Sequence, residues 1–372
     1  MLIGCPTEIK NNEFRVGLTP SAARAYIEAG HRVLVQEGAG VGSGIVDQEY
    51  LDAGAEIVQG AESIWKEAGM ITKVKEPLPE EYPLMQPGQI VYTYFHLAAD
   101  EELTRACLDR EIVAIAYETV QDKSGALPLL KPMSEIAGRM APLMGAYFLG
   151  KPFGGRGLLP TGVPGVLPAN VLIIGGGVVG SNAAKTASGF GSRVTVLDIN
   201  VDTLEHLGDI MPANVFTQFS NSQNLEESLK QADIVVGAVL VPGAKAPKLI
   251  SRDRLRIMKQ GAVLVDVAID QGGFAETSRA TTHSDPVYQV EGVQHYCVAN
   301  MPGAYARTST YALNNATIGY GLEIAAKGAE EACRENPMLC QGLNAYKGTL
   351  TCPPVGEAFQ LQNICKLPED VL

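Results

Sequence analysis

The stretch Val171-Leu172-Ile173-Ile174-Gly175-Gly176-Gly177-Val178-Val179-Gly180 decides the fold of this chain. Four apolar residues run directly into Gly175, Gly177 and Gly180, a spacing typical of a strand, a dinucleotide-binding turn and a helix. The first glycine permits the tight turn, the second lets the backbone approach a pyrophosphate, and the third lets helix and strand pack closely. A helix predicted over residues 181–190 would direct its free N–H groups at the phosphates. The glycines alone would also fit a purely structural turn, so the surrounding sequence matters.

A second apolar segment, residues 193–197, ends at Asp198. This position is close to the offset of about 20 residues at which an acid binds the adenosine ribose. A carboxylate there accepts both ribose hydroxyls and repels a 2′-phosphate, and neither Ile199 nor Asn200 is basic. The sequence therefore favours NAD over NADP, the alternative being that Asp198 is a solvated acid at a strand end.

The bulk composition indicates a globular protein of about two domains. The chain has 372 residues, of which 46% are hydrophobic and 19% charged, and its net charge is −12. This acidic balance argues against binding to nucleic acid or to an anionic membrane. We expect no signal peptide and no membrane span, because the N-terminus lacks a basic region and long apolar runs are interrupted. Seven scattered cysteines without a C-x-x-C pair are typical of reduced thiols in a cytoplasm.

The first third of the chain alternates predicted strands and helices, which indicates a parallel sheet covered by helices. A helix over 20–29 would have Thr19 as its cap, Pro20 at its first position and Gly30 as its stop. The glycine-rich segment 38–44 lacks the Gly-Lys-Ser/Thr of a phosphate loop, and we interpret it as a flexible surface loop. The strands of this region are predicted at 2–5, 31–36, 70–74, 90–95 and 112–116.

A second set of strands follows a long helix predicted over 132–149 and a crossing segment, 151–168, that is rich in Gly and Pro. Another long helix is predicted over 308–334, and the tail after it is too short for its own core, so it should pack back onto the first domain. Six strands complete a double βαβαβ set. They are predicted at 171–174, 193–197, 215–218, 234–239, 262–267 and 294–298.

The predicted fold class is therefore α/β, with two doubly wound parallel-sheet domains. The second is a Rossmann NAD-binding domain, residues 131–305, inserted in the first. Residues 1–130 plus 306–372 form the substrate and catalytic domain, and we expect a cleft between the two.

Five polar residues lie where parallel-sheet proteins bind their ligands, beyond the carboxyl ends of the strands. Arg15 lies in the loop after the first strand, Lys75 follows the third, and His96 follows the fourth. In the second domain Asp270 and Asn300 follow the last two strands. Each could instead be an ordinary loop or turn residue, but their shared position favours a common site.

The chemistry of these groups is specific. Arg15 and Lys75 would hold a carboxylate and polarise an adjacent carbonyl or imine. His96 can take or give a proton near neutral pH, and Asp270 could activate water or stabilise an iminium. Nicotinamide accepts a hydride from a carbon that bears an amine or a hydroxyl. The residues therefore point to a small α-substituted carboxylic acid as substrate, with amine and hydroxyl both open.

At these positions the chain resembles the alanine dehydrogenase family over essentially its full length. The matching segments are 3–10, 15–20, 73–77, 95–98, 175–180, 266–273 and 300–303. The resemblance implies reversible oxidative deamination of L-alanine to pyruvate and ammonium with NAD, in a homohexamer. It implies that Arg15 and Lys75 bind substrate and that His96 and Asp270 are catalytic; Asn300 is a further candidate for substrate binding.

The resemblance also extends the set of expected cofactor contacts beyond the glycine turn, with its Val178 and Val179, and Asp198. The contacts that it adds are Ser134, Ser220, Val239, Leu240, Arg279 and Met301. We also expect cofactor contacts from Val267, Ile269 and Val298. One position departs from the family, because some relatives pair a histidine on a metal where this chain has Lys327, four residues after Glu323. A protonated lysine cannot ligate a metal, so we predict none there.

Three other functions are compatible with the sequence. The soluble alpha part of a nicotinamide nucleotide transhydrogenase looks similar in both domains but needs no alanine site. An opine- or lysine-type amino-acid dehydrogenase would take a larger substrate. A non-enzymatic NAD sensor would bind the cofactor without turnover.

Overall fold

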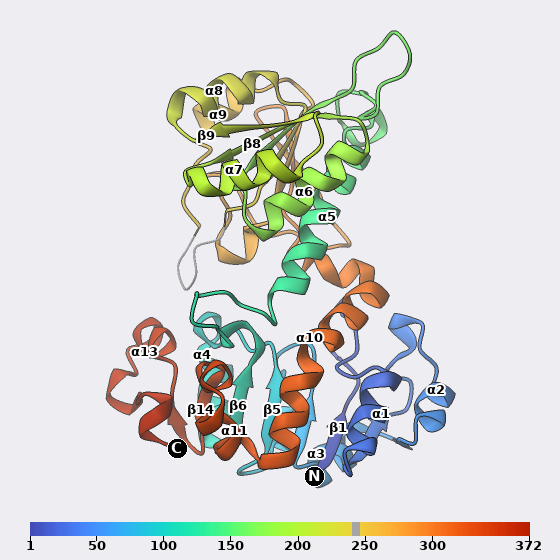
Figure 1. The fold of residues 1–372 in the computed structure, drawn as a ribbon, viewed down its shortest axis with the longest axis vertical. Helices are drawn as coiled ribbons and strands as arrows, with labels where there is room; N and C mark the ends of the chain where they lie inside the picture. The colour runs from blue at the N-terminus through green and yellow to red at the C-terminus, as the bar shows by residue number, and fades with distance from the viewer. Residues whose placement is uncertain (240–245) are drawn as a thin grey trace. The chain divides into compact units, whose positions relative to one another are not determined.

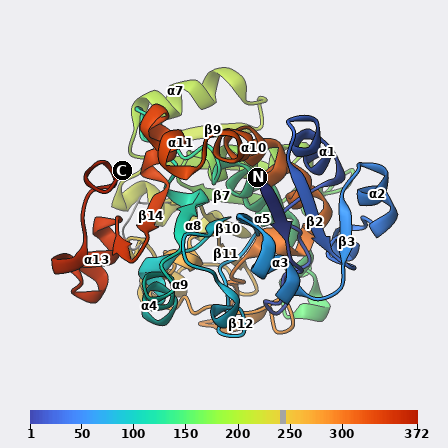
Figure 2. The same ribbon diagram turned by 90° about the horizontal axis from the view of Figure 1, so that it is seen from below.

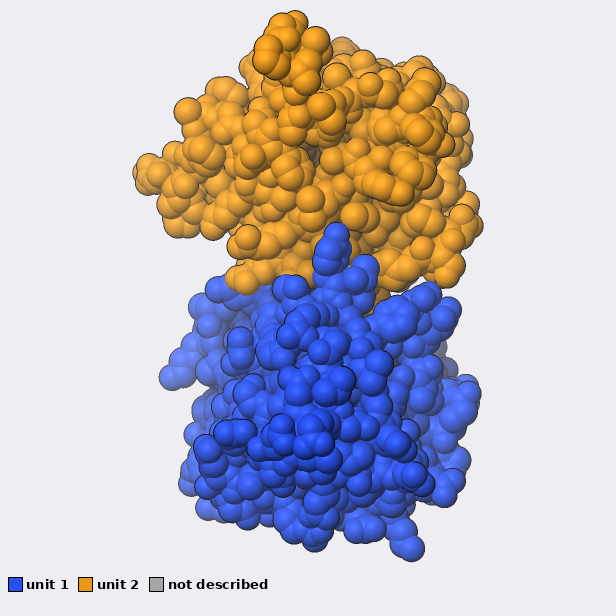
Figure 3. All heavy atoms as spheres, turned by 90° about the vertical axis from the view of Figure 1, so that its right-hand side faces the viewer, with its two compact units in different colours: residues 1–133, 303–372 blue, residues 134–302 orange. Residues whose placement is uncertain are grey.

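The computed structural model describes residues 1–239 and 246–372. Within these residues the chain forms two compact units, which Figures 1 and 3 show. Unit 1 comprises Met1–Met133 and Gly303–Leu372, and unit 2 comprises Ser134–Pro302. The chain leaves unit 1 in helix α5 (Lys131–Phe148) and returns to it just ahead of α10 (Ala306–Lys327). Unit 2 is therefore an insertion in the sequence of unit 1.

The sheet of unit 1 has the strand order β15-β14-β6-β5-β4-β1-β2-β3. From β6 to β3 every neighbouring pair is parallel, which is a doubly wound arrangement. The prediction of a purely parallel sheet is wrong at one edge, because β14 runs antiparallel to β6, and β15 to β14. The strands are β1 (Leu2–Cys5), β2 (Arg32–Gln36), β3 (Glu56–Val58), β4 (Met70–Thr72), β5 (Ile90–Thr93), β6 (Val113–Ala116), β14 (Leu343–Tyr346) and β15 (Thr349–Leu350).

Helices cover both faces of this sheet, with α1 and α10 on one side and α3 and α4 on the other (Figure 2). Helix α1 begins as predicted, because the Thr19 side chain accepts a hydrogen bond from the backbone N–H of Ala22 at 3.2 Å. The helices are α1 (Pro20–Glu28), α2 (Asp47–Asp52), α3 (Ala61–Glu67), α4 (Glu101–Asp109), α10, α11 (Ala329–Glu335), α12 (Pro337–Gln341) and α13 (Pro353–Phe359).

The C-terminal tail packs onto unit 1, as predicted. Val355 and Leu361 belong to the same buried cluster as Trp65 of α3 and Leu103 of α4. The two strands β14 and β15 extend the sheet on that side. The tail therefore completes the core of unit 1 instead of forming a core of its own.

A further prediction in unit 1 is wrong: the single helix predicted over 308–334 is broken at Gly328, whose backbone (φ 80°, ψ 162°) separates α10 from α11. The segment 38–44 lies at the surface, as predicted, with Val41 63% exposed. It is anchored at Ser43, which is buried and whose hydroxyl contacts the Thr310 hydroxyl at 2.8 Å and donates to the Phe14 carbonyl at 3.0 Å. A Cβ on Gly42 would lie 2.7 Å from that same carbonyl oxygen. The loop therefore packs against the segment that carries Arg15.

The sheet of unit 2 has the strand order β12-β13-β11-β10-β7-β8-β9. From β13 to β9 all pairs are parallel, in the order of a dinucleotide-binding fold. The edge strand β12, which was not predicted, is antiparallel to β13. The strands are β7 (Asn170–Ile174), β8 (Arg193–Asp198), β9 (Val215–Phe219), β10 (Ile234–Gly237), β11 (Val263–Asp266), β12 (Val287–Val290) and β13 (Val293–Tyr296).

Alternate residues of the central strand β10 face opposite helix layers. Ile234 lies against α5, where a Cβ on Gly145 would come within 2.6 Å of its side chain. Val235 belongs instead to the buried cluster that contains Leu229 of α8 and Leu255 of α9. Unit 2 contains most of α5 and, among its described residues, the helices α6 (Val178–Gly189), α7 (Val201–Ile210), α8 (Ser222–Gln231) and α9 (Arg252–Arg256).

The segment 151–168 folds as part of unit 2. The Pro160 carbonyl accepts hydrogen bonds from the Ala169 N–H at 3.1 Å and from the Ser192 hydroxyl at 3.0 Å. Its tip is a small hairpin closed by a bridge between Val163 and Val166. Among the helices of residues 1–239 and 246–372, none has both the length and the apolar composition of a membrane span.

Candidate functional site

The glycine turn of unit 2 is tight at two of its glycines and open at one. Gly175 has φ +101°, and a Cβ on it would lie 2.7 Å from the Ala238 carbonyl oxygen. A Cβ on Gly180 would overlap the carbonyl oxygen of Gly175. At Gly177, the N-cap of α6, nothing in the described chain lies within 4 Å of such a Cβ. Main chain is thus exposed where a pyrophosphate must approach, which fits a bound dinucleotide.

Asp198, the last residue of β8, is hydrogen-bonded to this turn. Its Oδ2 accepts from the Gly176 N–H at 2.6 Å, and its Oδ1 accepts from the Asn200 N–H at 2.8 Å. A carboxylate has about four lone-pair positions, so these two bonds leave acceptor capacity for ribose hydroxyls. Ser220 lies beside it, because its N–H donates to the Asp198 carbonyl at 2.8 Å.

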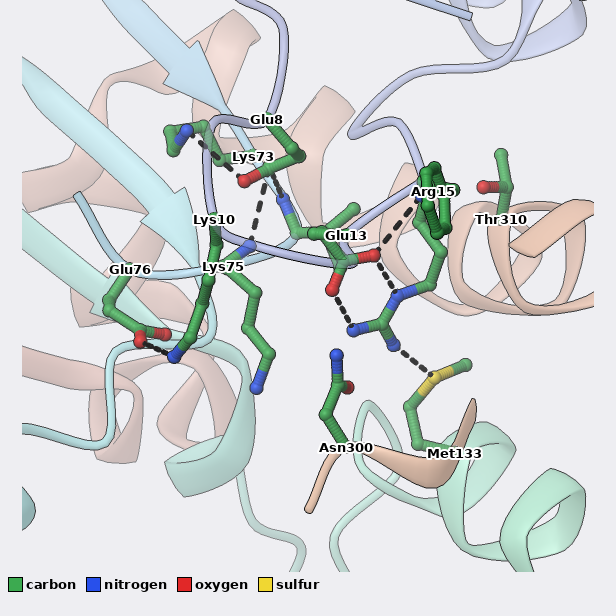
Figure 4. A network of polar contacts seen from close by, with 12 residues as sticks. Glu8, Lys10, Glu13, Arg15, Lys73, Lys75, Glu76, Met133, Asn300 and Thr310 are labelled. Atoms are coloured by element: carbon green, nitrogen blue, oxygen red, sulfur yellow. Dashed lines mark hydrogen bonds and ion pairs between the residues drawn. The ribbon is translucent and has the colours of Figure 1, made fainter. Parts of the chain in front are cut away.

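Arg15 of unit 1 is a buried cation, with 2% of its surface exposed. Its Nε and Nη2 donate to the two carboxylate oxygens of Glu13, each at 2.6 Å, and its Nη1 contacts Met133 Sδ at 3.1 Å (Figure 4). Burial acts to lower the pKa of Arg15, but the hydrogen bonds and charge of Glu13 outweigh it, and the pKa is raised. The guanidinium is therefore held charged and in a fixed orientation.

Lys75 lies just after β4, in a turn whose main chain is held by neighbouring side chains. Its N–H donates to Glu8 Oε1 at 3.3 Å, and its carbonyl accepts from the Thr93 hydroxyl at 2.9 Å. The next residue, Glu76, pairs with Lys10. In Figure 4 the cationic ends of Lys75 and Arg15 point to the same side of this network. Both groups come from unit 1, so the structure brings these two predicted substrate ligands to one edge of its sheet.

His96 lies beyond β5 in a left-handed backbone conformation (φ 52°), which is uncommon outside glycine and clusters at functional sites. Glu118 fixes this conformation, because its carboxylate accepts from the N–H of His96 at 2.5 Å and from that of Phe95 at 3.2 Å. The imidazole stacks parallel to the Tyr94 ring at 6.0 Å, and 46% of the side chain is exposed. The ring is thus oriented by its neighbours yet open to a reactant.

Asp270 is exposed in a short turn, Ile269–Gln271, after β11. The loop around it is held from two sides. Lys248 Nζ donates to the carbonyls of Gly272, Gly273 and Ala275, at 2.5, 2.9 and 3.1 Å. Asp266 Oδ2 accepts from the Phe274 N–H at 2.9 Å, and burial raises the pKa of Asp266. Asn300 has a left-handed backbone (φ 59°), and its carbonyl contacts His283 Nε2 at 3.4 Å.

The remaining expected cofactor contacts differ in exposure. Val178 and Arg279 are exposed, and Arg279 stacks over the Tyr288 ring at 4.0 Å. Leu240 lies outside the described residues. Those at least partly buried are Ser134, Val179, Ser220, Val239, Val267, Ile269, Val298 and Met301.

Lys327 of α10 is paired with two carboxylates. Its Nζ donates to Glu323 Oε1 at 3.1 Å and to Glu335 Oε2 at 2.7 Å. The other oxygen of Glu323 accepts from Asn336 Nδ2 at 2.8 Å. Lys327 therefore forms ion pairs at the position where the resemblance implied a metal ligand in some relatives.

Some residues of these sites were not predicted from the sequence. Glu13 and Met133 contact the Arg15 guanidinium, and Glu118 fixes the His96 backbone. Glu8 holds the turn that carries Lys75. For Glu13 the sequence did contain a signal, because this acid lies two residues before Arg15.

Both parts of the chain match models of one protein family. The family models described as "Alanine dehydrogenase/PNT, N-terminal domain" and "Alanine dehydrogenase/PNT, C-terminal domain" match residues 4–137 and 141–353. The chain is 55% identical over 362 residues to "Alanine dehydrogenase" of Methanococcus maripaludis, and 54% identical over 363 residues to "Alanine dehydrogenase 2" of Staphylococcus aureus. Each alignment covers 97% of both chains.

Solved structures agree with this assignment. A structure of "L-alanine dehydrogenase" matches with a TM-score of 0.94 at 49% identity, covering 97% of this chain and 99% of that one. A transhydrogenase from Sinorhizobium meliloti matches with a TM-score of 0.82 at 24% identity, covering 94% and 100%, and shares the fold. The chain belongs to the alanine dehydrogenase/PNT family, which confirms the resemblance seen in the sequence.

Proposed function

We infer that this chain is an L-alanine dehydrogenase, which converts L-alanine reversibly to pyruvate and ammonium with NAD. Unit 1 binds the substrate and unit 2 the cofactor. The observation that carries the proposal is the buried Arg15, held by Glu13 on the same side as Lys75, in a chain whose full-length relatives are named alanine dehydrogenases. The alternative, hydride transfer between two nucleotides, needs no binding site for alanine.

Two cations bind the substrate acid. Arg15 pairs with the carboxylate of alanine or pyruvate, and its fixed orientation makes this contact directional. Lys75 stabilises the negative charge that develops on the neighbouring oxygen, and Asn300 adds a hydrogen bond to the substrate. Met133, which contacts Arg15 Nη1, limits the space beside the carboxylate.

NAD supplies the hydride acceptor in the direction of alanine oxidation. The pyrophosphate of NAD approaches α6 at the turn formed by Gly175, Gly177 and Gly180. The Asp198 carboxylate accepts hydrogen bonds from the ribose hydroxyls. The other contacts come from the strand-end residues of unit 2. The support is the open side of the turn at Gly177 and the acceptor capacity of Asp198.

Proton transfer completes the reaction. Loss of a proton from the alanine ammonium and of a hydride from Cα to NAD would leave an iminium, to which water adds while His96 or Asp270 takes a proton. Return of that proton to the nitrogen lets the carbinolamine collapse to pyruvate and ammonium. His96 is positioned for this role by Glu118 and Tyr94, and Asp270 by the loop that Lys248 holds.

Replacing His96 by alanine should lower kcat by about 100- to 10,000-fold, the usual contribution of a general acid–base group. The KM for pyruvate should change little, because the carboxylate is bound by Arg15. Steady-state kinetics measures both. The control is His206→Ala, which alters an exposed histidine of α7. An unchanged kcat in His96→Ala would remove His96 from the mechanism.

Replacing Asp198 by alanine should raise the KM for NADH by about 10- to 100-fold, because charged hydrogen bonds of about 1.5–3 kcal/mol are lost. The preference for NADH over NADPH should fall, since the repulsion of a 2′-phosphate is removed. Asp202→Ala, at an exposed acid of α7, is the matched control. Retention of both the affinity and the preference would contradict the assignment.

We also propose that the chain assembles as a homohexamer in the cytoplasm. The hairpin of unit 2 exposes the apolar side chains of Leu159, Val163, Val166 and Leu167, and Leu167 is 84% exposed. Apolar groups gathered on one exposed element are typical of surfaces that are covered on association. Further copies of this chain are the partners we propose.

A further inference from the structure

Lys73, two residues before Lys75, is a fully buried lysine that the proposed reaction does not use. Its ammonium lies between two carboxylates, at 3.2 Å from Glu8 Oε2 and 2.9 Å from Glu81 Oε1. The side chains of the two glutamates are 2% and 4% exposed. A buried ion cluster of this kind is weak evidence for stability, because desolvation of the charges offsets their attraction. A role in fixing local geometry is therefore the more informative interpretation.

The second oxygen of each glutamate binds main chain in the turn after β4. Glu8 Oε1 accepts from the N–H groups of Val74, at 2.5 Å, and Lys75, at 3.3 Å. Glu81 Oε2 accepts instead from the N–H of Leu78, at 3.0 Å. The two carboxylates thus share Lys73, and Glu8 is the one that accepts from the N–H of Lys75, the residue proposed to bind substrate (Figure 4).

The Lys75 peptide is fixed on both sides. Glu8 holds its N–H, and the buried Thr93 hydroxyl holds its carbonyl at 2.9 Å. Burial raises the pKa of Glu8, while the charge of Lys73 acts in the opposite direction and favours the carboxylate. An ionised acceptor makes the stronger hydrogen bond to an amide, so Lys73 strengthens the contact between Glu8 and the turn.

We propose that Glu8, clamped by Lys73, is a positioning residue for Lys75, fixing the main chain from which the Lys75 ammonium reaches the substrate oxygen. The inference rests on the proposed role of Lys75 in binding pyruvate. A flexible lysine side chain gains directional precision only if its backbone is fixed, and a displacement of about 1 Å in a reacting group costs up to about 100-fold in rate.

Glu8 and Glu81 form a matched pair for the test. Each is buried and bound to Lys73, so replacing either by methionine should lower the midpoint of urea unfolding to a similar extent. Only Glu8→Met should also raise the KM for pyruvate, by about tenfold, with the KM for NADH unchanged in both. Glu8→Gln keeps a neutral acceptor for the two amides but loses the charge paired with Lys73, so it should raise the pyruvate KM by less than Glu8→Met does.

Lys75→Met distinguishes failure of the proposed substrate-binding role of Lys75 from failure of the proposed positioning role of Glu8. If this variant keeps the wild-type KM and kcat with pyruvate, the proposed role of Lys75 fails. If Lys75→Met loses pyruvate binding while Glu8→Met and Glu81→Met show equal pyruvate KM values, the positioning role of Glu8 is overturned. Should either methionine variant not fold, the comparison of Glu8→Gln with Glu81→Gln decides in the same way, with a rise in pyruvate KM expected only for Glu8→Gln.

Discussion

Replacing Arg15 by methionine is expected to raise the KM for pyruvate by about 100-fold or more and to lower the free energy of unfolding by about 3–5 kcal/mol. The first effect follows because the bound carboxylate loses its charged partner. The second follows because the Glu13 side chain is 0% exposed and would lose the cation that neutralises its charge. Steady-state kinetics and urea unfolding measure the two effects separately.

The double variant Arg15→Met with Glu13→Gln distinguishes binding from folding. It removes the buried charge that Arg15 no longer neutralises, so most of the lost stability should return, while pyruvate binding should not. Arg15→Lys should also bind poorly, because an ammonium cannot reproduce the two parallel bonds to Glu13 and present a third donor in a fixed direction. A double variant with the wild-type pyruvate KM would exclude Arg15 as the carboxylate ligand.

Replacing Gly180 by alanine should weaken NADH binding by about 10- to 100-fold, because the new Cβ overlaps the carbonyl oxygen of Gly175. The Cβ is attached directly to the main chain of α6 and the oxygen is main chain of the turn, so α6 and β7 must separate and the turn must change shape. Titration of NADH fluorescence gives the dissociation constant directly.

Gly189→Ala in the same helix is the control. Nothing in the described chain lies within 4 Å of a Cβ at Gly189, and alanine is favoured over glycine in a helix by up to about 1 kcal/mol. This variant should bind NADH normally and be at least as stable as the wild type. Normal binding by Gly180→Ala would show that the turn does not hold the cofactor.

The sequence predicted the central strands well because they are buried and apolar. The strands β3, β12, β14 and β15 were missed for the opposite reason, since they are short strands at or next to a sheet edge. The pairing of β14 with β6 also joins segments that are distant in sequence. The break at Gly328 was also missed, because a single glycine inside a helical pattern is often tolerated. Its left-handed backbone is evident only in the structure.

The site was predictable in part. Arg15, Lys75 and His96 stood out as polar residues at strand ends, and β1, β4 and β5 do lie next to one another in the sheet. The acids that orient them did not stand out, because a glutamate near a cation usually belongs to a solvated surface pair. Burial of Glu8 and Glu13 depends on tertiary packing, and Glu118 reaches the His96 turn from a residue beyond the next strand.

The most direct test is the oxidation of NADH by the purified protein in the presence of pyruvate and ammonium. We predict turnover that requires both substrates, forms L-alanine, and falls sharply when pyruvate is replaced by larger keto acids. Binding of NADH without this turnover, or turnover that needs only a second nucleotide as hydride acceptor, would contradict the proposed function.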